Sequence, residues 1–341
     1  MSRFEINWKI RSLALKEVFT ISRSSRSEVP NVFITLTKDD ISGYGEAGPN
    51  TRYNESSEKV TEYVKRLPEG FLDEIKTDAE LAQKLDDLPD PIQSAKAAIE
   101  MAWLDWWAKS QNQPLWKLWE ANSFVGPVTS YTIGIDTPEK MQEKIRAAEN
   151  YPVYKIKLGT DHDRDLIKAI REVTDKPLRV DANEGWKTIA QAKKEIEFLA
   201  TQKVELIEQP MPSANIKEMK ELKKWSPLPL CADESFIGGE DLNEIAEAFH
   251  IINIKLMKIG SLVKARKVID EAHRLGLQVM IGCMIESSLA NAAGALLALK
   301  ADYADLDGHL LISNDPFTGL KVDSSGKLIL SEQPGFGVKR Q

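Results

Sequence analysis

The chain has 341 residues, of which 42% are hydrophobic and 28% are charged, as is typical of a soluble globular protein with a large core. This length is sufficient for two domains, or for a barrel with an accessory domain. The formal net charge of −7 argues against a nucleic-acid-binding protein, which usually has a basic excess or a basic patch.

Membrane and secretory signals are weak. The longest apolar runs stay short of 18 residues, and the segment from Met1 to Ile6 lacks the apolar core of a signal peptide. The two cysteines, Cys231 and Cys283, lie in apolar runs that resemble strands and do not suggest a disulfide framework. We therefore expect a reduced, cytoplasmic protein whose partners include neither membranes nor nucleic acids.

The first third of the chain predicts strands followed by helices. In residues 1 to about 50, the stretches Trp8 to Leu15 and Asn31 to Thr37 are rich in β-forming residues. Residues 55 to about 120 show helical periodicity, and Ala95 to Trp107 is rich in Ala and Trp. Aromatic residues at helical spacing usually belong to a core or an interdomain contact. This order of elements predicts an α+β domain.

The polar stretch Phe19 to Ser27 separates the two expected strands and carries the cations Arg23 and Arg26. It could be a solvated hairpin loop or a mobile lid over a site, since connecting segments often carry function.

After about residue 125 the pattern changes to regular alternation of apolar strands and helices. A spacing of roughly 25 residues is what one strand and one helix need, and eight such units close a barrel. No full helix is evident after the eighth strand. The strands are expected to begin near Val128, Val153, Leu178, Val204, Leu228, Ile251, Gln278 and Tyr303.

Acids end three successive strands of the expected barrel. Strands three, four and five end in Asp181, Glu208 and Asp233, and in a barrel such strand ends face one mouth. Each acid could instead cap the following helix. Three carboxylates in succession, without a nearby His or Cys, favour a Mg²⁺ site. Asn183 and Glu234 would orient the ligands or a lysine.

Lysines end strands two and six. Lys155 and Lys157 share one face of strand two. Burying a charged lysine at the barrel mouth costs free energy unless the lysine is paired or functional. Nearby cations lower the pKa of such a lysine, so it can act as a base near neutral pH. Lys157 and Lys258, from roughly opposite strands, would flank a metal-bound substrate and favour inversion at a carbon next to a carboxylate. Strict alternation places Lys258 on the opposite face of the strand from Lys255, so the strand must end or bulge before Lys258, which Gly260 allows.

Asp305 and Asp307 share one face of strand eight and lie too far round the ring to join the metal ligands. Two acids at this place would suit a cationic group of a substrate, such as an α-ammonium. The alternative is a pair that caps the loop at Gly308.

These strand ends carry motifs that resemble the enolase superfamily, muconate-lactonizing subgroup, and within it the dipeptide epimerases. The resemblance covers essentially the whole length. The motifs are KIKLG at 155–159, DANEGW at 181–186, EQP at 208–210, ADES at 232–235, NIKLMKIGS at 253–261 and CMIESS at 283–288.

The resemblance implies an α/β protein with a (β/α)7β TIM-like barrel and an N-terminal α+β capping domain that the C-terminal tail completes. The expected boundaries are 1–122 for the capping domain, 123–315 for the barrel and 316–341 for the returning segment.

The resemblance also implies a mechanism. One Mg²⁺ would be held by Asp181, Glu208 and Asp233, and Lys157 and Lys258 would transfer protons through an enolate. The substrate contacts that it implies are Thr132, Lys155, Cys283, Met284, Ile285, Asp305, Leu306 and Asp307, and the specificity lid would include Phe19, Arg23 and Arg26.

We therefore expect an isomerase, a Mg²⁺-dependent epimerase of an Ala-Xaa dipeptide, which could form a homo-oligomer as barrels of this family often do. Asp305 and Asp307 distinguish it from enzymes whose substrates lack an ammonium. The alternatives are an N-acylamino acid racemase or o-succinylbenzoate synthase of the same subgroup, an aldolase in which a lysine forms an imine, and a barrel that only binds. The preferred C-terminal residue stays open between acidic and apolar.

Overall fold

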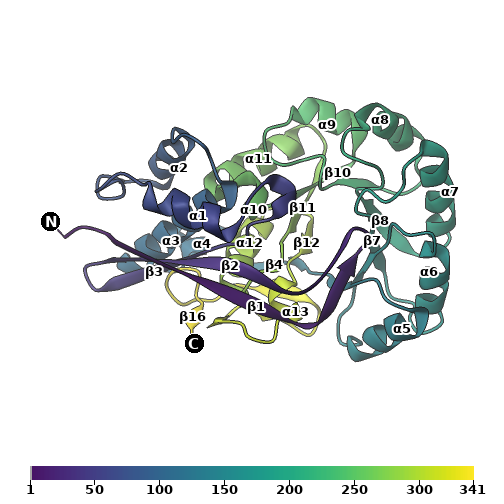
Figure 1. Ribbon diagram of the computed structural model, residues 1–341, viewed down its shortest axis with the longest axis horizontal. Helices are drawn as coiled ribbons and strands as arrows, with labels where there is room; N and C mark the ends of the chain where they lie inside the picture. The colour runs from purple at the N-terminus through teal and green to yellow at the C-terminus, as the bar shows by residue number, and fades with distance from the viewer. Residues whose placement is uncertain (1) are drawn as a thin grey trace.

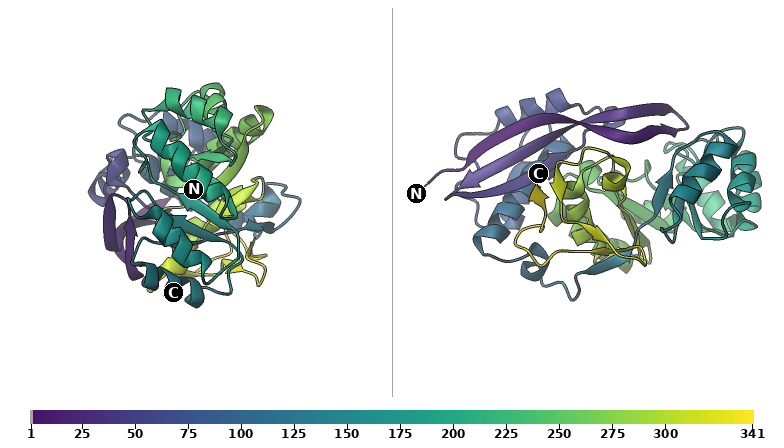
Figure 2. Two further views of the ribbon diagram at one scale, coloured as in Figure 1. Left: turned by 90° about the vertical axis from the view of Figure 1, so that its right-hand side faces the viewer. Right: turned by 90° about the horizontal axis from the view of Figure 1, so that it is seen from below.

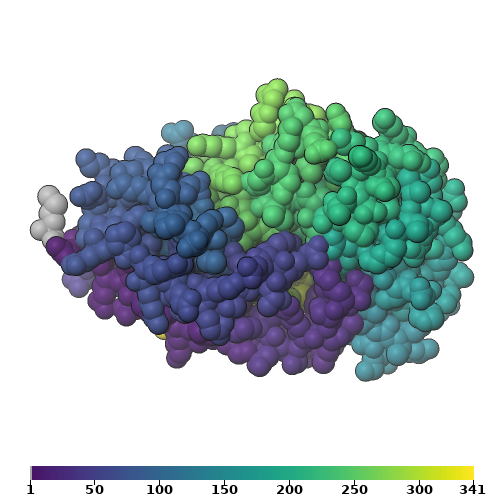
Figure 3. Space-filling model, turned by 45° about the horizontal axis from the view of Figure 1, so that its top comes forward, coloured from purple at the N-terminus to yellow at the C-terminus, as the bar shows by residue number. Residues whose placement is uncertain are grey.

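The computed structural model describes residues 2–341, in which a capping unit lies against a barrel (Figure 1). The cap contains the antiparallel sheet β1-β2-β3, formed by Glu5–Ile21, Ser24–Lys38 and Ile41–Ala47. Figure 2 shows that β1 and β2 form a long hairpin that extends from the cap toward the barrel helices. Figure 3 shows these N-terminal residues in purple, lying across the barrel.

The stretch Phe19 to Ser27, which the sequence predicts as a hairpin loop or a mobile lid, is mostly strand in the structure. Its residues continue the two strands, with Thr20 opposite Ser25, and only Ser22 and Arg23 form the turn. The hydroxyl groups of Thr20 and Ser25 lie 2.9 Å apart across the ladder. The strands were mistaken for a loop because their side chains here are polar and partly exposed, so the apolar alternation that marks a strand is missing.

The helices of the cap pack against this sheet. Gly45 of β3 allows close approach to the longest of them, since a Cβ there would lie 1.9 Å from the carbonyl oxygen of Ala98. Trp103 is buried and stacks on Trp107, so the aromatic stripe belongs to the core. The elements are η1 (Thr51–Tyr53), α1 (Ser57–Lys65), α2 (Asp78–Asp86), α3 (Gln93–Ser110) and α4 (Leu115–Leu118).

Eight parallel strands within residues 2–341 form the barrel sheet, each hydrogen-bonded to the next in sequence. A bridge between Thr129 and Ala304 joins its two ends. The strands are β5 (Tyr131–Ile133), β6 (Tyr154–Lys157), β7 (Leu178–Asp181), β8 (Val204–Glu208), β9 (Leu230–Ala232), β10 (Ile251–Lys255), β11 (Gln278–Gly282) and β12 (Tyr303–Asp305).

Each of the seven connections between these strands carries a helix on the outside of the sheet in the described part of the chain (Figure 1). After β12 the only helix in residues 2–341 is the short α13 (Gly308–Leu311). The arrangement confirms the expected (β/α)7β barrel. The connecting helices are α5 (Pro138–Ala147), α6 (Asp163–Arg171), α7 (Ile189–Ala200), α8 (Ile216–Trp225), α9 (Leu242–Ala248), α11 (Leu262–Arg274) and α12 (Ser288–Ala298).

The first barrel strand begins at Tyr131 and not near Val128. Residues Val125–Val128 form β4, which pairs with β15 (Lys327–Ile329) in a separate sheet that also contains β14 (Lys321–Val322). An apolar run at the expected spacing was therefore assigned to the barrel although its partner is distant in sequence.

The C-terminal segment returns to the cap, as expected. Phe317, in β13 (Phe317–Thr318), stacks on Phe33 of β2 with ring centres 5.9 Å apart. β13 pairs with β16 (Lys339–Arg340), and the backbone N–H of Phe336 donates to Asp105 of α3 at 3.0 Å. The domain boundaries at 122 and 315 stay predictions.

Buried carboxylates of the cap dock onto the N-termini of barrel helices. Glu46 of β3 accepts hydrogen bonds from the backbone N–H groups of Ser287 and Ala290 at the start of α12. Glu100 of α3 accepts one from Val263 in α11 at 2.9 Å. Helix N-termini favour negative charge, yet burial still raises the pKa of Glu100 to about 7. The interface between cap and barrel thus depends on buried carboxylates and backbone N–H groups that have few other hydrogen-bond partners.

No helix in residues 2–341 has both the length and the apolar character that crossing a membrane would require.

Replacing Glu46 by Ala should destabilise the protein by about 3 kcal/mol, because buried donors lose their acceptor. These donors are the backbone and hydroxyl of Ser287 and the side-chain amide of Asn31. Urea unfolding measures the effect. Glu28→Ala is the control, since it removes one exposed bond to Ser12 and should cost less than about 0.5 kcal/mol. Equal losses in the two variants would contradict the role of Glu46.

Candidate functional site

A cavity of about 510 Å³ lies at the C-terminal ends of the barrel strands. Its walls come from the β1–β2 hairpin, the segment around η1 and the ends of several barrel strands. The mouth of a barrel is where functional groups are expected, because side chains from different strand ends converge there.

Three carboxylates meet beside this cavity, and one of them, Asp233, lines it. Asp181 ends β7 and lies beside Glu208, which ends β8, and Asp233 follows β9. One ligand oxygen from each lies within 4.8 Å of the other two, and all three residues are buried. The three acids that the sequence predicts as one group thus lie side by side in the fold.

The donor set fits a hard divalent cation such as Mg²⁺. All three groups offer carboxylate oxygens. Among residues 2–341, Glu208 Oε2 accepts no hydrogen bond, although Lys155 Nζ lies 2.6 Å away. Burial, and then the charge of Asp181, raise the pKa of Glu208 to about 7. Three acids this close require positive charge, which a cation would supply.

Lys155 supplies part of this charge. Its Nζ lies 2.6 Å from Asp305 and from Glu208, and 3.3 Å from Asp181. Burial alone would favour the neutral amine, but these carboxylates raise the pKa of Lys155 well above its ordinary value. Lys155 therefore links the expected metal site to the acids of β12.

Two further lysines reach the cavity from different sides. Lys157 at the end of β6 donates to Asp181 Oδ2 at 2.6 Å. Lys255 at the end of β10 donates to Asp233 Oδ2 at 2.9 Å. Both residues line the cavity. Each candidate acid–base group thus pairs with a different carboxylate of the triad.

The structure places Lys258, which the sequence predicts as the second acid–base lysine, away from the cavity. β10 ends at Lys255, and the helical turn α10 (Leu256–Ile259) follows, closed by Gly260 at φ 79°. This turn carries Lys258 behind Asp233, where Nζ donates to Asp233 Oδ1 and to Phe236 O, each at 2.7 Å. Lys258 does not line the cavity, whereas Lys255 does.

The two acids of β12 have different surroundings. Asp305 accepts hydrogen bonds at 2.6 Å from Lys155 and from the hydroxyl of Ser130. Asp307 accepts one from the backbone N–H of Thr132 at 2.6 Å. Burial, and then the charge of Asp305, raise the pKa of Asp307 to about 6. Asp307 is therefore the carboxylate that keeps capacity for a cationic ligand.

The structure does not bring the side chain of Leu306 to the cavity. Leu306 is buried against α12, where a Cβ on Gly294 would lie 2.7 Å from Leu306 Cδ2. Side chains alternate along a strand, so the residue between two inward acids faces outward. The other expected contacts that line the cavity are Thr132, Cys283, Met284 and Ile285.

The hairpin is fastened to the barrel at its tip. Arg23 donates to the carbonyl oxygen of Asn183 at 3.0 Å and to Glu234 Oε1 at 2.6 Å. Asn183 also donates weakly to Glu234, at 3.4 Å. Phe19 and Arg26 line the cavity from the same hairpin. Arg23, Asn183 and Glu234 thus form one contact region at the mouth.

Sequence reasoning missed two kinds of residue. Arg52 and Tyr53 of η1 line the cavity, and Arg52 pairs with Glu184 at 2.6 Å, but no pattern marks this loop. Asn253 donates to Glu208 at 2.8 Å. A buried amide in the apolar run of β10 was an available signal, because buried polar groups need partners.

Known proteins resemble the whole chain. Residues 6–119 match the family model described as mandelate racemase/muconate lactonizing enzyme, N-terminal domain, and residues 139–340 match the model described as enolase C-terminal domain-like.

Similar proteins of known name include the L-Ala-D/L-Glu epimerase of Bacteroides thetaiotaomicron, 39% identical over 96% of this chain and 86% of that protein. The L-Ala-D/L-amino acid epimerase of Pedosphaera parvula is 39% identical over 97% of each chain. Among solved structures, a dipeptide epimerase from Enterococcus faecalis, complexed with Mg and the dipeptide L-Leu-L-Tyr, has a TM-score of 0.90, 29% identity and complete coverage of both chains (100%).

Removing any one acid of the triad should abolish high-affinity Mg²⁺ binding in calorimetric titrations at pH 8. Affinity in the unaltered protein should weaken as the pH falls through about 7, because protonated Glu208 no longer offers its charge to the cation. The variants are Asp181→Asn, Glu208→Gln and Asp233→Asn.

The control is Asp241→Asn, which changes an acid that only caps α9. Unchanged Mg²⁺ affinity is expected there. If the three triad variants also bound Mg²⁺ like the unaltered protein, the three acids would not be ligands of the cation.

Proposed function

Because the chain belongs to the mandelate racemase/muconate lactonizing enzyme family, we propose that it is a Mg²⁺-dependent dipeptide epimerase, an isomerase acting on Ala-Xaa dipeptides. The observation that carries this proposal is the placement of Lys157 and Lys255 on two sides of one carboxylate triad, with Asp307 lining the same cavity. The reaction inverts the α-carbon of the C-terminal residue.

Asp181, Glu208 and Asp233 would hold Mg²⁺, which would stabilise negative charge on the carboxylate of the substrate and so make the adjacent α-proton more acidic. Lys157 and Lys255 come from β6 and β10 and approach from different sides. One lysine, as the amine, takes the α-proton, and the other, as the ammonium, returns a proton to the opposite face. One proton leaves and one arrives, so only the configuration changes.

Asp307 would bind the N-terminal ammonium of the dipeptide. Asp305 is already paired with Lys155, so we assign it the role of fixing that lysine. A contact between Asp307 and an ammonium is a charge-assisted hydrogen bond, which is roughly twice as strong as a neutral one. This contact would set the position of the α-carbon between the lysines.

The side chain of the C-terminal residue would lie against the hairpin and the β11 loop. This wall offers the apolar residues Phe19, Met284 and Ile285 together with the cation of Arg26. A library of Ala-Xaa dipeptides, scored by deuterium incorporation at the α-carbon, ranks acidic against apolar side chains.

A second candidate is an N-acylamino acid racemase. The observation in its favour is that Lys155 neutralises Asp305, which leaves a single acid for an ammonium. Such an enzyme would turn over N-acyl substrates faster than dipeptides and would keep that activity in Asp307→Asn.

We also propose a cytoplasmic location. The free thiols of Cys231 and Cys283 support it, since unpaired cysteines are usual in reducing compartments.

Lys157→Ala and Lys255→Ala should each lower inversion by about 10³-fold, because each removes one proton donor or acceptor. Each variant should still exchange the α-proton of one epimer with solvent. Proton NMR in deuterated water follows both processes. Inversion at the rate of the unaltered enzyme in either variant would exclude the two-lysine mechanism.

The kcat/KM for dipeptides should rise with pH through about 6, since only ionised Asp307 attracts the ammonium. Asp307→Asn should raise KM and remove this step from the profile. An N-acetylated dipeptide, which lacks the charge, serves as the matched substrate control. A step of equal size with the acetylated substrate would show that another group titrates.

A further inference from the structure

Lys258 is a buried lysine whose hydrogen-bonding capacity is used by the protein itself. Its side chain is 1% exposed, and Nζ donates to Asp233 Oδ1, to Phe236 O and to the carbonyl oxygen of Asp233, the last at 2.5 Å. An ammonium has three N–H groups. Lys258 therefore has none left for a ligand in the main cavity.

These contacts hold the carboxylate of Asp233 on the side away from the main cavity. Asp233 Oδ1 faces Lys258, and Asp233 Oδ2 faces Lys255 and the cavity side. Because Lys258 holds both the carboxylate and the carbonyl oxygen of the same residue, it restricts the rotation of the Asp233 side chain. The contact with Phe236 also ties down the loop that follows β9.

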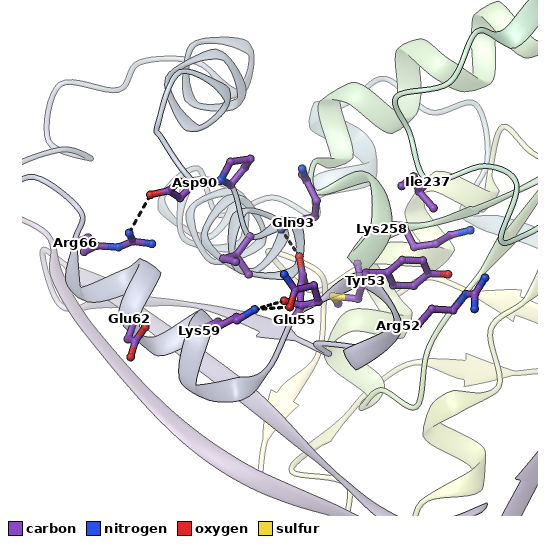
Figure 4. A pocket seen from close by; sticks show the side chains of 14 residues that line it. Arg52, Tyr53, Glu55, Lys59, Glu62, Arg66, Asp90, Gln93, Ile237 and Lys258 are labelled. Carbon is purple, nitrogen blue, oxygen red and sulfur yellow. Dashed lines mark hydrogen bonds and ion pairs between the residues drawn. The ribbon is translucent and has the colours of Figure 1, made fainter. Parts of the chain in front are cut away.

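The same loop contributes to two cavities, since Asp233 lines the main one and Ile237 lines a second one. Figure 4 shows Lys258 beside Tyr53 and Arg52, at one end of a second cavity of about 610 Å³, which Ile237 also lines. Lys258 contributes to the wall of this second cavity and not to the main one. Its ammonium is the only link from α10 to the segment Asp233 to Phe236 among the side-chain hydrogen bonds of residues 2–341.

We propose that Lys258 is a positioning residue for the metal site, which holds Asp233 in the orientation that binds Mg²⁺. The proposal rests on the proposed function for its kinetic part only, since Mg²⁺ affinity is measured without substrate. Groups that orient metal ligands typically change metal affinity by about 10- to 100-fold when they are removed.

Lys258→Met keeps the length of the side chain and removes the ammonium. It should weaken Mg²⁺ binding by about 10-fold or more in calorimetry, and it should slow the exchange of both epimers equally. Saturating Mg²⁺ should restore most of the rate. Lys258→Arg, which keeps a cationic donor, should lie between the variant and the unaltered protein.

Lys96→Met is the matched control. Lys96 is also buried and ion-paired, with Asp86, but it lies in the cap. It should lower stability without changing Mg²⁺ affinity. If Lys258→Met fails to fold, Lys258→Gln gives the same measurement, since it keeps two N–H donors but loses the charge.

Mg²⁺ affinity in Lys258→Met that equals or exceeds that of the unaltered protein would overturn the proposal. Loss of exchange for one epimer alone would overturn it too, and would make Lys258 an acid–base lysine. Weaker Mg²⁺ binding in a protein that turns over no dipeptide would support the positioning role while the proposed function failed.

Discussion

Charge balance around three buried carboxylates is the constraint on which the structure depends. Asp181, Glu208 and Asp233 offer oxygens within 4.8 Å of one another in a buried setting, and such groups cannot stay ionised together without nearby cations. Lysines from β6, β10 and α10 surround them. The parallel strands of the barrel bring these distant segments to one level, so the fold is the means by which the charges meet.

The cap covers this arrangement of charges and also contributes charged side chains to it. The β1–β2 hairpin places Arg23 against Glu234, and η1 places Arg52 against Glu184, so both contacts fall on loops that follow triad strands. Glu184 and its neighbour Asn183 both have positive φ, 66° and 45°, a conformation that is costly for residues with a Cβ. Contacts from the cap help to hold this strained loop.

Much of the fold and most of the site followed from the sequence, because strands buried on both faces appear as apolar runs and acids at their ends face one mouth. The errors have physical causes. An alternating pattern cannot show where a strand ends, so the sequence predicts Lys258, and not Lys255, as the second acid–base lysine. A strand with polar side chains resembles a loop, which hid the hairpin from Phe19 to Ser27. Tyr53 comes from a loop with no pattern, so only the structure could place it.

The fastening of the hairpin by Arg23 has a consequence for exchange with solvent. The base of the hairpin belongs to the cap sheet, and its tip is held by the partly exposed Arg23, which pairs with the buried Glu234 and donates to the carbonyl oxygen of Asn183. An ion pair of this kind is partly screened by salt. We expect ligand entry and release to be faster at high ionic strength, whereas the buried charges beneath the lid should respond little. Ionic strength would therefore separate the opening of the lid from the chemistry below it.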